Sequence, residues 1–78
     1  MRTPQQIAAT WRRKQPANRR TTGIALVYGG RVYAWKNELR DPQHEQPGAV
    51  AVDVSGNTWT ATGGNSRDGA KSWDPMQA

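Results

Sequence analysis

The chain has 78 residues, no cysteine and a formal net charge of +5, from eleven Lys and Arg against six Asp and Glu. A chain this short forms a single domain with a thin core, and without cysteine it can hold neither a disulfide nor a thiolate metal site. No apolar stretch approaches the ~20 residues of a membrane span, and no signal peptide is evident, so the sequence predicts a cytoplasmic protein with no membrane partner.

The charge is sorted along the chain. Residues 1–36 carry eight basic side chains and no acid, whereas residues 37–78 carry three bases and all six acids. The two parts therefore have formal charges of +8 and −3. Sorted charge of this kind indicates a charged partner, because uniform charge is enough for solubility.

Residues 3–15 are predicted to form one amphipathic helix. Thr3 is a suitable N-cap, Pro4 suits the first helical position, and Gln6 completes a capping box. Pro16 ends the helix, because a proline disfavours helical geometry in the residue before it. The apolar stripe at helical spacing consists of Ile7, Ala8 and Trp11. The helix is expected to dock with this stripe and to present Arg12 and Arg13 on a basic back.

Residues 16–22 read as a polar, basic linker, and residues 23–36 as a β-hairpin turning at Gly29-Gly30. A two-residue turn predicts a large, aromatic face and a small face. The large face consists of Ile24, Leu26, Tyr28, Arg31, Tyr33 and Trp35. The small face consists of Ala25, Val27, Val32 and Ala34. Because small side chains allow close approach, the helix is expected to dock on the small face, although both faces are apolar.

The rest of the chain reads as loop, hairpin and tail. Residues 37–48 are a loop with one helical turn expected around residues 37–40, and residues 49–62 are a second hairpin turning at residues 55–57. In-register pairing predicts a buried face and a wet face. The buried face consists of Val50, Val52, Val54, Trp59 and Ala61, and the wet face of Asp53 and the threonines. Residues 63–78 are a loop or frayed tail that Trp73 pins to the body.

These elements predict one α+β domain over residues 1–78. An N-terminal amphipathic helix packs on a small antiparallel sheet of two hairpins, about four strands in all. A partly closed SH3-like or OB-like barrel is the variant of this architecture.

The usual catalytic and metal-binding sets are missing from the sequence. Its single histidine, in His44-Glu45, resembles half of a zinc-protease motif that has no second histidine. Asp41 and Glu45 fall in a loop that reads as exposed, and Asp53 on a wet strand face. The glycine pairs lack phosphate-loop spacing. The sequence therefore predicts a non-catalytic protein without cofactor or metal.

The strongest constellation is basic and aromatic. Arginine forks match phosphate oxygens, and aromatic faces stack on unpaired bases. The candidate nucleic-acid-binding residues are Arg12, Arg13, Lys14, Arg19, Arg20, Arg31, Lys36, Tyr33 and Trp35. The favoured function is binding of DNA or RNA, with Tyr33 and Trp35 either stacking on bases or lying in the core.

Two other functions fit the same charge pattern. A small basic protein can act as an inhibitor or adaptor that covers the acidic surface of a partner protein. It can also be a structural subunit whose Trp-rich faces form interfaces. A chain with +8 in one part and −3 in the other is further compatible with a homo-oligomer formed head to tail.

Overall fold

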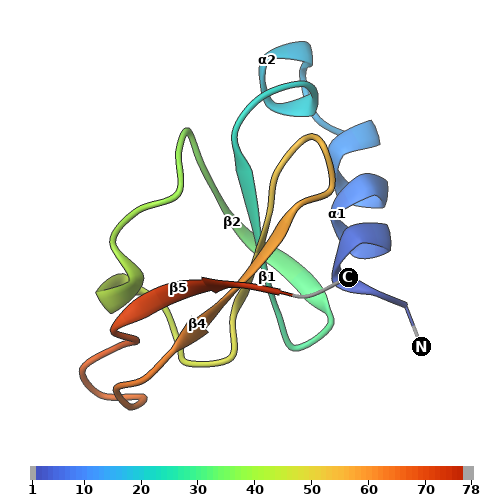
Figure 1. Cartoon of the computed structure of the whole chain (residues 1–78). Coiled ribbons are helices and arrows are strands. Elements are labelled where there is room, and N and C mark those ends of the chain that lie inside the picture. The colour runs from blue at the N-terminus through green and yellow to red at the C-terminus, as the bar shows by residue number, and fades with distance from the viewer. Residues whose placement is uncertain (1, 77–78) are drawn as a thin grey trace.

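The computed structural model describes residues 2–76 and places two helices and one 3₁₀ turn around a five-stranded sheet (Figure 1). The elements are α1 (Pro4–Arg13), α2 (Ala17–Arg20), β1 (Ile24–Tyr28), β2 (Arg31–Lys36), η1 (Pro42–His44), β3 (Val50–Val52), β4 (Thr58–Thr62) and β5 (Ser72–Pro75). The α+β class is confirmed. The strand order is β2-β1-β3-β4-β5, with every neighbouring pair antiparallel.

The sheet differs from the prediction at its far edge. Residues 72–75 form β5 on β4 instead of a frayed tail, so the sheet has one strand more than expected. Because β2 and β5 are both edge strands, the sheet is open and does not close into a barrel. Residues 77 and 78 lie outside the described part of the chain. Within residues 2–76, neither helix has the length and apolar character needed to cross a membrane.

The predicted capping box sets the start of α1. The Thr3 hydroxyl accepts the Gln6 amide at 3.1 Å, and the Gln6 side chain accepts the Thr3 amide at 2.9 Å. The helix ends at Arg13, just before the predicted boundary. The segment expected to be a linker contains a further helical turn, α2, in which the Pro16 carbonyl accepts the amides of Arg19 and Arg20 at 2.9 and 3.0 Å.

Helix α1 covers one face of β1, β2 and β3. Its buried residue Ala8 packs against the sheet core formed by Ala25, Val27 and Val52. The half-buried residues around this cluster are Ile7, Trp11, Val32 and Val50. The predicted docking of the apolar stripe on the small face is therefore confirmed, except that Ala34 packs on the opposite face.

A β-bulge in β2 changes the predicted faces of the first hairpin. Tyr28 opposes Arg31 as predicted, but the register shifts between Leu26 and Val27, so that Leu26 opposes Ala34 rather than Tyr33. A bulge leaves one residue unpaired and re-aims the strand beyond it. Tyr33 is that residue here, and Trp35 consequently opposes Ala25 on the helix-covered face. The prediction that Tyr33 and Trp35 share a face is wrong.

The second face of the sheet is covered by the loop of residues 37–48 and by tryptophans. Ile24, Leu26 and Ala51 form its buried cluster, and the half-buried residues against them are Ala34, Leu39, Trp59 and Trp73. The Trp73 indole donates to the Arg40 carbonyl at 3.2 Å, so this residue pins the end of the chain as expected. The helical turn in the loop is η1, not residues 37–40.

The second hairpin pairs differently from the prediction. Val52 opposes Thr58 and Ala51 opposes Trp59, so Val50 and Val52 face α1 while Trp59 faces the opposite side. Val54, predicted on the buried face, lies beyond the strand and is 49% exposed. The Asp53 carboxylate accepts the amides of residues 55 and 57 at 2.9 and 2.8 Å and closes the turn. Both faces of this small sheet are covered, so the simple division into one buried and one wet face is wrong.

Candidate nucleic-acid interface

Four exposed cations gather where α1 ends and α2 begins. Arg13 and Lys14 close α1, and Arg19 and Arg20 form the last turn of α2. These four residues are called the basic end. Figure 1 shows α2 at one end of α1 and the β1–β2 turn at the other, so the basic end occupies one end of the molecule.

Arg12 is not part of that surface, because its side chain is only 7% exposed. One guanidinium nitrogen donates to the carbonyls of Arg19 and Thr22 at 2.9 and 2.8 Å. The other donates to the carbonyls of Gly23 and Val52 at 2.8 and 3.3 Å. The expected placement of Arg12 on an exposed basic back is therefore wrong.

Arg12 instead connects three segments: α1, which carries it, residues 19–23, and β3. Burial lowers its pKa, and the nearby charge of Asp53 opposes that shift. Since arginine stays protonated in proteins, the group remains a cation surrounded by carbonyl oxygens. Helical spacing held a signal for this placement: Arg12 lies four residues after the buried Ala8, and residues four apart share a helix face. The carbonyls that it binds come from later segments, which no local pattern reveals.

The basic end carries no counter-charge in the described residues. Among residues 2–76, the ion pairs join Lys36 to Glu45 at 2.8 Å, and Arg40 to Glu38 and Asp41 at 3.7 Å each. None of these pairs involves the basic end. Its positive charge is therefore presented to solvent.

Trp35 lies beneath the basic end. The Arg19 guanidinium carbon sits 5.4 Å from the centre of the indole ring, which is cation–π geometry. The indole N–H donates to the Thr22 carbonyl at 3.1 Å. Gly23 lies so close that a Cβ there would come within 2.4 Å of the ring. Trp35 is thus half-buried and held in place on three sides.

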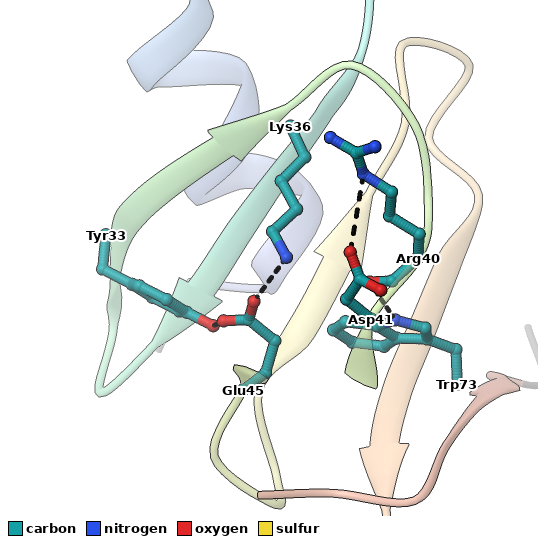
Figure 2. A network of polar contacts seen from close by, with 6 residues as sticks. All are labelled: Tyr33, Lys36, Arg40, Asp41, Glu45 and Trp73. Atoms are coloured by element: carbon teal, nitrogen blue, oxygen red, sulfur yellow. Dashed lines mark hydrogen bonds and ion pairs between the residues drawn. The ribbon is translucent and has the colours of Figure 1, made fainter. Parts of the chain in front are cut away.

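Tyr33 and Lys36 point to the other side of β2, where they meet Glu45 (Figure 2). The Tyr33 hydroxyl donates to one Glu45 carboxylate oxygen at 2.5 Å, and the Lys36 ammonium lies 2.8 Å from the other. Burial raises the pKa of Tyr33, and the hydrogen bond and negative charge of Glu45 raise it further. Glu45 is buried, not exposed as its loop position suggested. The positive charge of Lys36 is therefore balanced by the carboxylate of Glu45.

Arg31 lies at the far end of the first hairpin, beside the β1–β2 turn. It opposes Tyr28, whereas Lys36 opposes Ile24 at the other end of β1. Four residue steps along a strand span about 13 Å. The predicted site residues are therefore split between the basic end, the interior, the Glu45 contact and the hairpin turn.

Comparison with protein-family models, curated proteins and solved structures found no match. The functional inference consequently rests on the geometry alone. Among residues 2–76, no three His, Asp or Glu side chains lie close enough together to hold a metal ion. The chemistry that the basic end offers is recognition of anionic oxygens, such as those of phosphate groups.

Proposed function

We propose that the protein is a non-catalytic cytoplasmic binding protein that engages nucleic acid through the basic end. The observation that carries this proposal is the group of four exposed cations, Arg13, Lys14, Arg19 and Arg20, none of which has an acidic partner among residues 2–76. Three of the four are arginines, whose planar forks bind phosphate oxygens in pairs.

The buried Arg12 supports the proposal because it holds α2 against α1 and the sheet. Its bonds to the Arg19 and Thr22 carbonyls fix the backbone that carries Arg19 and Arg20. A rigid base lowers the conformational entropy lost when the cations meet their ligand. The predicted contacts from Lys36, Tyr33 and Arg31 are left out of the proposed interface, since they are paired with Glu45 or lie at the other end of β1.

Salt dependence of binding tests the proposal. Four phosphate contacts on duplex DNA give a slope of log K against log salt of about −3.6, from counterion release. The double variants Arg13→Gln/Lys14→Gln and Arg19→Gln/Arg20→Gln should each bring the slope to about −1.8. A matched control is Arg67→Gln/Lys71→Gln, which removes two exposed cations from the loop before β5. Fluorescence anisotropy with labelled oligonucleotides gives these slopes.

The control variant shows whether binding depends on the basic end in particular or only on the net charge of the protein. If it reduces the slope as much as the two double variants do, the basic end is not the interface. If the wild-type protein fails to bind any single-stranded or duplex oligonucleotide at low salt, nucleic-acid binding is refuted. The adaptor function that covers an acidic protein surface would then be favoured, because the same cations suit it.

A further inference from the structure

We infer that the basic end binds the phosphate backbone of a nucleic-acid duplex and does not stack on the bases of a single strand. This inference rests on the proposed function and specifies the class of ligand. It follows from where the aromatic side chains of the basic half of the chain lie and what they contact.

The two tryptophans of the basic half are both engaged. Trp11 packs against the core under α1, and the Trp35 ring is covered by Arg19. Arg19 lies over the Trp35 ring at 5.4 Å, and the Thr22 carbonyl holds the indole N–H. A base stacking on that ring would have to displace the guanidinium, which is itself one of the four phosphate-binding cations. Stacking on Trp35 and the phosphate contact of Arg19 therefore compete for one position.

The two exposed tyrosines lie elsewhere. Tyr33 is 45% exposed, but it is on the opposite side of β2 and its hydroxyl is bonded to Glu45. Tyr28 is 47% exposed and lies at the β1–β2 turn, about 13 Å along the strand from the end of β1 that faces α2. Neither ring is available to a base whose phosphate sits on the basic end.

Without stacking, the density of phosphate charge decides the ligand. Duplex DNA carries one charge per ~1.7 Å of axis and gives a slope of about −0.9 per contact, against about −0.7 for single strands. Counted from 1 M salt, where the salt term is zero, four contacts make this difference about sixfold in favour of the duplex at 0.1 M salt. Backbone contacts carry no base information, so the binding is expected to be independent of sequence.

The first test compares four labelled probes: two duplexes of unrelated sequence and one strand of each. The expected result is equal affinity for the two duplexes within threefold, about sixfold weaker binding of both strands at 0.1 M salt, and a steeper salt slope for the duplexes. Equal or tighter binding of single strands would overturn the inference. So would a difference of tenfold or more between the two duplexes.

The second test uses a matched pair of single variants. Arg19→Gln and Arg20→Gln each remove one cation and should each weaken duplex binding by about eightfold at 0.1 M salt. Only Arg19→Gln uncovers the Trp35 ring. Losing one contact by itself should raise the ratio of single-strand to duplex affinity by about 1.6-fold in both variants. The ratio should therefore rise clearly more in Arg19→Gln than in Arg20→Gln.

The outcomes separate this inference from the proposed function. Absence of all binding refutes the proposed function itself. Binding that depends on the basic end but prefers single strands refutes only the duplex inference. An affinity ratio that rises no more in Arg19→Gln than in Arg20→Gln shows that the guanidinium does not block stacking on Trp35, and it overturns the inference.

Discussion

Truncating Arg12 should destabilise the protein far more than truncating the neighbouring Arg13. The Arg12→Ala variant removes four hydrogen bonds to backbone carbonyls, three of them at 2.8–2.9 Å. A hydrogen bond to a charged group contributes about 1.5–3 kcal/mol, but burying the guanidinium offsets much of that sum. The free energy of unfolding should fall by about 3 kcal/mol, in the range seen when a buried charged contact is broken.

The loss is large for a domain of this size. In domains of 60–100 residues, 1 kcal/mol shifts Tm by about 4–8 °C, so Arg12→Ala should lower Tm by about 12–24 °C. Arg12→Lys keeps the charge, but its three donors lie on one nitrogen and cannot reach all four carbonyls, so about half of the loss should remain. Arg13 is exposed, and Arg13→Ala should stay within about 0.5 kcal/mol of wild type.

Urea unfolding followed by tryptophan fluorescence gives the free energies, and thermal scans give Tm. Two results would refute the reasoning. One is an Arg12→Ala variant that unfolds within 0.5 kcal/mol of Arg13→Ala. The other is an Arg12→Lys variant as stable as wild type, which would show that the charge, and not the geometry of the guanidinium, holds the three segments together.

Three further predictions concern the cap, the loop contact and the buried acid. Thr3→Ala should lower stability by about 1 kcal/mol in urea unfolding, whereas Thr3→Ser should be near neutral, because only the hydroxyl caps the helix. Gly69→Ala should lower Tm strongly, since Gly69 has φ +84° and its Cβ would lie 1.8 Å from the Gln43 carbonyl oxygen; an unchanged Tm would contradict that packing. Tyr33 should lose its stabilising effect as pH rises above 10: its folded pKa lies above its ordinary value of about 10, so the unfolded state releases the proton first. The stability gap between wild type and Tyr33→Phe in urea should therefore narrow from pH 9 to pH 11, and a constant gap would count against the contact with Glu45.

Local patterns predicted the features that depend on few neighbouring residues. The Thr3 capping box, the apolar stripe of α1 and the turn at Gly29-Gly30 are each decided within about ten residues of chain. Turn and cap chemistry act over this distance, so the sequence contains the whole signal. The expected docking of α1 on the small residues of the first hairpin also followed from local composition.

The features that were missed depend on distant partners. The bulge at Tyr33 turns Trp35 to the face opposite Tyr33, and alternation could not show it because both faces of the hairpin are apolar. Arg12 reads as a surface cation until residues 22, 23 and 52 supply its acceptors. Ser72–Pro75 becomes a strand because β4 offers a free edge, although its composition favours a loop.

The candidate site was predicted in part. The basic character of the N-terminal half was read from composition, but its division among separate places was not. The composition gives only the number of charges. Where each basic side chain lies depends on how α1 docks and on where the loop of residues 37–48 folds back. Lys36 and Arg12 belong to the same basic half as Arg20, yet only Arg20 faces solvent.

The bulge in β2 also bears on how copies of this chain meet. An open sheet offers unpaired N–H and C=O groups at both edges, which can recruit a strand from another molecule. The bulge interrupts one edge at Tyr33, and β5 ends on Pro75, which has no N–H to donate. Both edges are therefore poor templates for strand addition. Self-association and fibrillar growth by edge pairing are consequently disfavoured.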